Sequence, residues 1–150
     1  MFQKLSPWLK LAGYFKSELS LPIIHATRIS DIATARHAIK NNLLDLVGMT
    51  RAHIADPHLV NKIIEGNEDR IRPCVGAGYC IDRIYGEGEM LCIHNVATTR
   101  EKTISHIVKP SKKNHKVIVV GGGPAGLEAA RVSAETVSYT HLTLPTILLV

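Results

Sequence analysis

Apolar positions follow two different periods in the first seventy residues of the chain, and each period predicts a different element. Two short apolar runs, Leu21–Thr27 and Leu43–Met49, are typical of buried strands. The residues between these runs place apolar side chains on one face of a helix, and either Ser30 or Asp31 can cap its first turn. That face consists of Ile32, Ala35 and Ile39.

A second helix is predicted after the second strand. Asp56 is a favoured capping residue, Pro57 suits the first helical position, and Gly66 is a typical end. The apolar stripe of this helix consists of Leu59, Val60, Ile63 and Ile64. The order strand–helix–strand–helix is the repeating unit of a parallel α/β fold.

The pattern changes after these elements. Residues 67–100 show little periodicity and contain the cysteines, and residues 101–115 form a polar linker. Residues 116–120 then predict a strand, which a glycine-rich turn joins to a helix from about Pro124 to Glu135. A new structural unit is therefore expected to begin at residue 116.

The last residues do not continue that unit as a second strand would. The stretch from Thr136 to Thr146 resembles the translation of a transposon-type sequencing adapter in one reading frame. We interpret residues 136–150 as an adapter-derived, non-native tail and exclude them from the fold prediction. The alternative is a genuine β-rich tail.

Composition and charge narrow the classes of function only slightly. The 150 residues are 45% hydrophobic and 21% charged, as in ordinary globular chains. The net charge is +5, but the positive residues are scattered apart from four lysines between residues 109 and 116, which are typical of a solvated linker. We therefore expect no nucleic-acid partner. Because no signal peptide or membrane span is apparent, we expect a cytoplasmic protein.

The glycine-rich turn has the form Gly121-x-Gly123-x-x-Gly126, with Pro124 and Ala125 at the start of the helix. In a dinucleotide fingerprint the first glycine permits a tight turn and the second lets the backbone approach a pyrophosphate. The third lets helix and strand pack closely. The helix N-terminus adds positive potential for the phosphates. The turn therefore predicts a site for FAD or NAD(P).

The three cysteines are Cys74, Cys80 and Cys92, with five and eleven residues between them. In a chain without an export signal, they are better explained as reduced thiols or metal ligands than as disulfides. Three alternatives remain open: an iron–sulfur cluster, a Cys₃His zinc site, or buried thiols in a structural linker. His94 is close enough in sequence to Cys92 to serve as an additional ligand.

The order of these parts resembles the iron–sulfur flavoprotein branch of the old yellow enzyme family, over roughly residues 6–135. The resemblance implies an α/β fold: the C-terminal part of a TIM (β/α)₈ barrel, a cysteine-rich segment, and the start of a Rossmann-type FAD/NAD(P)-binding domain. The corresponding ranges are residues 1–66 for the last two βα units of an FMN-binding barrel, 67–100 for the iron–sulfur segment, 101–115 for a linker, and 116–135 for the first Rossmann unit.

The resemblance also implies roles for individual residues. Arg28, Thr50 and Arg51 match positions that contact the FMN phosphate, although the family often has glycine at the places of Thr27 and Thr50. The alternative is that both arginines are ordinary loop residues paired with carboxylates such as Asp31 and Asp56. Cys74, Cys80 and Cys92 match three ligands of a [4Fe–4S] cluster, and Ala77 stands where the family has the second cysteine.

The function implied for the parent protein is that of an FMN- and FAD-dependent oxidoreductase with an iron–sulfur segment. It would transfer electrons between a small organic substrate, an N-methylated amine or an enoyl or dienoyl compound, and NAD(P)H or another acceptor. We expect this chain to be an internal fragment of a homo-oligomeric enzyme, inactive in isolation and without a catalytic residue of its own. The alternatives are a small Cys/His metal-binding or interaction module and an inert truncated reading frame.

Overall fold

The structure is a computed structural model that describes residues 5–26, 28–113 and 115–136. The chain divides into two compact units, unit 1 at residues 1–106 and unit 2 at residues 107–150. Elements in unit 1 run in the order α1 (Leu9–Glu18), β1 (Ile24–His25), α2 (Ile32–Lys40), β2 (Leu46–Val47), α3 (Thr50–Ala55), α4 (Leu59–Ile64), the 3₁₀ turn η1 (Glu68–Arg70) and α5 (Tyr79–Tyr85). Unit 2 contains α6 (Pro124–Thr136).

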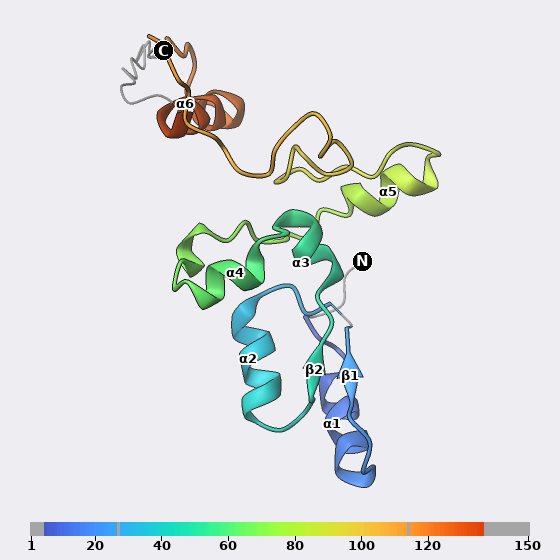
Figure 1. Ribbon diagram of the computed structural model, residues 1–150. Helices are drawn as coiled ribbons and strands as arrows, with labels where there is room; N and C mark the ends of the chain where they lie inside the picture. The colour runs from blue at the N-terminus through green and yellow to red at the C-terminus, as the bar shows by residue number, and fades with distance from the viewer. Residues whose placement is uncertain (1–4, 27, 114, 137–150) are drawn as a thin grey trace, which may run out of the picture. The chain divides into compact units, whose positions relative to one another are not determined.

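The centre of unit 1 is a parallel strand pair with a helix between the strands in sequence (Figure 1). Ile24 pairs with Leu46 and His25 with Val47. Two parallel strands need a crossover connection, and α2 supplies it. The predicted parallel arrangement is therefore confirmed, although each strand is only two residues long and occupies part of its predicted apolar run.

Helix α2 begins where the sequence predicts a cap. Asp31 has extended backbone geometry, and its carboxylate accepts a hydrogen bond from the backbone N–H of Thr34 at 2.7 Å. This contact satisfies one of the N–H groups that a helix leaves unpaired in its first turn. The capping residue is thus Asp31 rather than Ser30, and the helix ends at Lys40.

A small apolar core joins four helices of unit 1 to the strand pair. Its buried members are Leu9, Ala12, Ile29, Ala38, Leu44, Met49, Ala52 and Leu59. Leu44 is 1% exposed and Ala38 is fully buried, so α2 and the approach to β2 lie at its centre. Three of the eight are alanines, which lets the helix backbones approach closely but buries little apolar area per residue.

The prediction for the second helix is wrong at its start. The helix begins at Leu59 as α4, and a further short helix, α3, occupies Thr50–Ala55, where the sequence predicts neither a helix nor a strand. Asp56 is the residue after α3, and His58 occupies the position before α4. The Asp56 side chain does accept a nearby backbone N–H, from His58 at 3.1 Å, but most of its contacts are to more distant residues.

Unit 2 contains the predicted helix but not the predicted strand. Helix α6 starts at Pro124, as expected, and ends at Thr136. Among the described residues, 116–120 have no strand assignment, because a strand requires a hydrogen-bonded neighbour. Their exposure still alternates, with Ile118 at 76% and Val120 at 81%. Most of the tail assigned to an adapter, residues 137–150, lies outside the described residues, as do Thr27 and Asn114.

Candidate functional site

The predicted phosphate-contacting residues follow the two paired strands. Arg28 comes three residues after the end of β1, and Thr50 and Arg51 begin α3, three residues after the end of β2. Because β1 and β2 are parallel, both loops leave the same edge of the strand pair. Arg28 and Arg51 are half-buried and Thr50 is exposed. The structure thus brings these segments to one edge, where an anion can be shared between them.

The backbone at this edge is tightly arranged. Arg28 has a φ of +53°, in the left-handed region that few residues other than glycine adopt. At Gly48, a Cβ atom would lie 2.6 Å from the Cβ of Ala26, so glycine is required where the two loops diverge. His25 has a buried Nε2 with no hydrogen-bond partner among the described residues. A bound polar group can satisfy this atom, so the edge fits a small anionic ligand.

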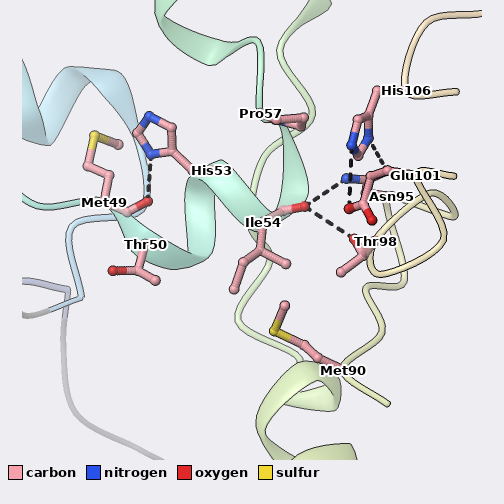
Figure 2. A pocket seen from close by; sticks show the side chains of 10 residues that line it. All are labelled: Met49, Thr50, His53, Ile54, Pro57, Met90, Asn95, Thr98, Glu101 and His106. Atoms are coloured by element: carbon pink, nitrogen blue, oxygen red, sulfur yellow. Dashed lines mark hydrogen bonds and ion pairs between the residues drawn. The ribbon is translucent and has the colours of Figure 1, made fainter.

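A hollow of about 520 Å³ lies along α3 (Figure 2). Its wall comes from α3 and from residues 90–106, a range in which the sequence predicts no helix or strand. Thr50 and His53 line one side of the hollow, and Thr98 and His106 line the opposite side; Ile54 and Met90 also line it. The ring nitrogen Nδ1 of His53 lies 2.9 Å from the carbonyl oxygen of Met49, which holds the imidazole over the helix. The hollow combines apolar walls with several convergent polar groups.

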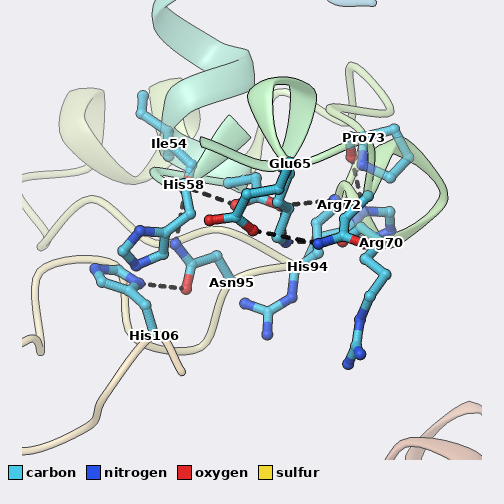
Figure 3. Close-up of polar contacts among 12 residues, drawn as sticks. Ile54, His58, Glu65, Arg70, Arg72, Pro73, His94, Asn95 and His106 are labelled. Atoms are coloured by element: carbon cyan, nitrogen blue, oxygen red, sulfur yellow. Dashed lines mark hydrogen bonds and ion pairs between the residues drawn. The ribbon is translucent and has the colours of Figure 1, made fainter. Parts of the chain in front are cut away.

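Asn95 is the polar centre of that wall. It is 2% exposed, and its side-chain amide donates to the carbonyl oxygen of Ile54 at 2.8 Å. Its side-chain oxygen accepts from the N–H of Ala97 at 3.1 Å and lies 3.2 Å from Nδ1 of His106. These contacts attach the segment after Cys92 to the C-terminal end of α3 (Figures 2 and 3). The sequence offers no signal for Asn95, because a lone asparagine in a segment without periodicity is ordinary.

Asp56 forms a second buried polar centre. Its side chain is 3% exposed and accepts from the backbone N–H of Arg72 at 2.9 Å, from that of His58, and from the ammonium group of Lys62. Burial alone raises the pKa of Asp56. The hydrogen bonds from Lys62, Arg72 and His58 and the charge of Lys62 outweigh burial, so the pKa lies below its ordinary value. Asp56 is therefore an ionised anchor for the start of the cysteine segment.

The three cysteines are free and half-buried. Cys74 follows Arg72 and Pro73, Cys80 lies in α5, and Cys92 lies in the irregular segment after α5. Within residues 5–26, 28–113 and 115–136, no group of three or more His, Cys, Asp or Glu side chains is close enough to hold a metal ion. Ala77 lies between Gly76 and Gly78, both with positive φ. The structure thus does not bring the cysteines together, and three thiols do not fit a four-cysteine cluster.

His94 connects the two ends of the cysteine segment (Figure 3). Its Nδ1 lies 2.8 Å from the carbonyl oxygen of Pro73. Because a carbonyl can only accept, Nδ1 of His94 is the donor in this contact. Cys74 and Cys92 are each within two residues of this bond. The backbone segments that carry them therefore lie next to each other.

The glycine turn of unit 2 has the local geometry that its sequence predicts. Gly121 has a φ of +105°, and a Cβ atom at Gly126 would lie 1.9 Å from the carbonyl oxygen of Gly121. Only glycine therefore fits the third position. At Gly123 a Cβ would meet no atom within 4 Å, so space remains above the turn. The backbone N–H of Leu127 donates to the carbonyl of Gly123 at 2.9 Å, which starts α6 at the turn.

No helix among the described residues is both long and apolar enough to cross a membrane. This finding covers the helices of both units, of which α6 is the longest at thirteen residues.

Comparison with individual known proteins identifies relatives of this chain. No protein-family model matches it. It is 57% identical over 130 residues to a protein of Rhizobium meliloti (strain 1021) named "Probable N-methylproline demethylase", covering 87% of this chain and 19% of that protein. It is 51% identical over 134 residues to the multifunctional alkene reductase/demethylase OYE of Caballeronia cordobensis, covering 89% of this chain and 19% of that protein.

The solved structure of 6-hydroxypseudooxynicotine amine oxidase from Pseudomonas geniculata N1 superposes with a TM-score of 0.84 at 30% identity, covering 95% of this chain and 22% of the oxidase. The chain thus spans about a fifth of the length of the relatives it matches. Over that stretch, this chain belongs to the iron–sulfur flavoprotein branch of the old yellow enzyme family.

Proposed function

We propose that these residues serve in a flavin-dependent oxidoreductase that transfers electrons between a small organic substrate and NAD(P)H or another acceptor. The observation that carries the proposal is the 57% identity to the protein named as a demethylase. A match over 130 of 150 residues includes the strand-edge arginines, the three cysteines and the glycine turn. The names of the relatives favour an N-methylated amine or an alkene as the substrate, and the family resemblance adds enoyl and dienoyl compounds.

The proposed place of these residues in the larger protein follows the same family layout. Residues 1–66 would be the last two βα units of an FMN-binding (β/α)₈ barrel, and residues 116–135 the first unit of a Rossmann-type domain. Ile24 and Leu46, which are paired across β1 and β2, are 64% and 55% exposed. A parallel sheet with an exposed apolar face is typical of one that continues into further strands and layers. This exposure supports the barrel assignment.

Arg28, Thr50 and Arg51 would hold the FMN phosphate. Arginine grips a phosphate with two parallel hydrogen bonds, and the loops after the last two strands of a barrel are where phosphates bind. The support is that both loops leave one edge, beside the unpartnered Nε2 of His25. Bound FMN would supply the hydride chemistry, and the residues of this chain would orient it and neutralise its charge.

Gly121, Gly123, Pro124, Ala125 and Gly126 would hold the pyrophosphate of FAD or NAD(P). The open space above Gly123 lets a ligand approach the backbone, and the thirteen-residue α6 starts directly after it. The close approach of Gly126 to Gly121 supports the same assignment, because it fixes the turn against the helix.

Cys74, Cys80 and Cys92 remain the proposed metal ligands, but no electron-transfer step is assigned to them. A [4Fe–4S] cube takes four soft ligands, and Ala77 cannot supply one. A cytoplasmic location and a homo-oligomeric parent protein belong to the same proposal.

Cofactor analysis tests the proposed function. The protein that carries this chain is purified without oxygen, and its FMN, FAD, iron and zinc are measured per polypeptide. The expected result is about one FMN per chain, with a second nucleotide, FAD or NAD(P), bound as well. A colourless protein with stoichiometric zinc would contradict the proposal and support the small metal-binding module instead.

A further inference from the structure

Both ends of one loop are attached to the same short helix. We define the cysteine loop as residues 73–94, which contain all three cysteines. Arg72 precedes the loop and Asn95 follows it, and each makes a partly buried hydrogen bond at or next to the C-terminal end of α3. The two bonds join residues 16 and 41 positions apart in sequence, so they are tertiary contacts rather than local turns.

The first anchor is Asp56. As a 3% exposed carboxylate it cannot remain charged without partners, and Lys62 and two backbone N–H groups supply them. Lys62 also donates to the carbonyl oxygen of Arg70 at 2.7 Å. One lysine and one aspartate therefore fix the chain at residues 70 and 72, immediately before the cysteine loop.

The second anchor is Asn95. Its amide satisfies the carbonyl of Ile54, which lies at the end of α3 and has no helical partner there. Thr98 approaches the same oxygen at 3.4 Å. Because Asn95 is 2% exposed, loss of its side chain leaves the buried N–H of Ala97 without a partner and the Ile54 carbonyl with only the longer contact from Thr98.

Helix α3 links these anchors to the strand edge. It has six residues and is therefore about 9 Å long. Its first residues are Thr50 and Arg51, and its C-terminal end carries Ile54 and, immediately beyond, Asp56. One rigid turn and a half of helix therefore separates the strand edge from the cysteine loop.

We propose that Asp56 and Asn95 are positioning residues that hold the cysteine loop at a fixed spacing from the flavin-phosphate end of α3. This inference rests on the proposed function for the identity of the two sites, but the anchoring itself involves only the described residues. The bond from His94 to Pro73 keeps the two ends of the loop together.

Thiol alkylation tests the anchoring. The full chain is treated with iodoacetamide at neutral pH, and modification of Cys74, Cys80 and Cys92 is followed separately by mass spectrometry. Asn95→Ala is expected to speed labelling of Cys92 about tenfold, the factor that corresponds to loss of about one buried hydrogen bond. Asn67→Ala removes an exposed side-chain amide that donates to Glu65; it is the matched control and should change no rate.

Lys62 gives an independent test with a rescue. Lys62→Met leaves the Asp56 carboxylate without its cation and is expected to speed labelling of Cys74 about tenfold. Lys62→Arg keeps a charged donor and should restore the rate to within about threefold of the original. Lys16→Met, at an ion pair with Asp45 elsewhere in unit 1, is the control.

Three outcomes would overturn the proposal. The first is that the cysteines of the unsubstituted chain are alkylated as fast in buffer as in urea. The second is that Asn95→Ala and Lys62→Met leave the alkylation rates unchanged. The third is equal acceleration of all three cysteines without rescue by Lys62→Arg, which would show general destabilisation instead of local anchoring. Flavin is measured on the protein that carries the chain, so absence of flavin would remove the proposed function without changing the labelling result.

Discussion

The two units of this chain hold their candidate sites in different ways. In unit 1, the candidate residues are held in place by an apolar core and by polar contacts between residues far apart in the sequence. In the described part of unit 2, the glycine turn and α6 make mostly local contacts, and Ala130 at 9% exposure is the buried apolar residue. The contact from the N–H of Ser111 to the carbonyl of Thr136 at 2.7 Å is the long-range exception.

This difference shows that a short motif is sufficient for local backbone geometry, whereas a strand and a core require contacts with distant residues. The turn of unit 2 has its characteristic glycine geometry, because backbone sterics alone require it. Its strand is not formed among the described residues, because strand formation needs partners that the motif does not contain. Unit 1 has a pair of strands and a helix between them, and that minimum is enough to bury a core.

The largest predicted effect is on the core of unit 1. Leu44→Ala should lower the free energy of unfolding of unit 1 by about 3 kcal/mol, because Leu44 is 1% exposed and a cavity would remain. Leu127→Ala is the matched change in α6, where the side chain is 55% exposed, and should cost less than about 1 kcal/mol. Urea denaturation followed by circular dichroism measures both. Equal effects would contradict the contrast between the units.

The second effect concerns Asp56 and acid. Asp56→Asn should cost about 2 kcal/mol at neutral pH, because it removes a charged acceptor from Lys62 and two N–H groups. The pKa of Asp56 is lower in the folded chain than in the unfolded chain, so the unfolded state binds more protons as the pH falls. Its stabilisation is therefore present above about pH 4 and is lost as the pH drops through the folded pKa.

Denaturation curves between pH 2 and 7 check this prediction. The unmodified chain should lose stability of unit 1 below about pH 4, and Asp56→Asn should show a flatter profile over the same range. A variant profile that parallels the original would show that Asp56 does not carry the acid sensitivity.

The third effect is within the glycine turn. Gly126→Ala would place a methyl carbon 1.9 Å from the carbonyl oxygen of Gly121, so the turn must open, at a cost of about 1–2 kcal/mol. Gly123→Ala meets no atom within 4 Å and is the control. Amide hydrogen exchange at Leu127, whose N–H donates to Gly123, should quicken in the first variant and stay unchanged in the second. Similar exchange in both would refute the close packing.

The smallest effect is on the surface of α6. Arg131 donates to Glu128 at 2.6 and 2.8 Å and to Glu135 at 2.8 Å, and its hydrogen bond to Glu128 is the largest cause of its raised pKa. The arginine side chain is 40% exposed, so Arg131→Gln should cost only about 0.5 kcal/mol. Thermal melting at low and high salt measures it, and the difference between variants should shrink with salt. An effect above 2 kcal/mol would show a buried network instead.

Sequence reasoning predicts the elements whose signals are local. Helix α2 has a capping aspartate and a clear apolar face, and α6 follows a glycine turn with proline at its first position. Both are confirmed within a residue or two. Gly126 is also predictable, because the reason for glycine there is a single close contact.

The elements that sequence reasoning misses depend on distant contacts. Helix α3 has six residues, which are too few to show an apolar period. Asp56-Pro57 resembles a helix start because aspartate is a favoured capping residue and proline a favoured first helical residue. In the folded chain the Asp56 carboxylate instead accepts hydrogen bonds from the backbone N–H of Arg72 and from the ammonium group of Lys62. Asn95 is identified only by its burial and its bond to Ile54, and no pattern in the sequence marks either.

The most direct test of the central claim compares FMN with riboflavin, which lacks only the phosphate. Both are titrated by fluorescence quenching into the flavin-free protein that carries this chain, in its original form and with Arg28→Ala and Arg51→Ala together. We predict that FMN binds at least about a hundredfold more tightly than riboflavin and that the double variant loses this preference. Equal affinity for the two flavins in the original protein would contradict the claim that the strand edge of unit 1 is a phosphate site.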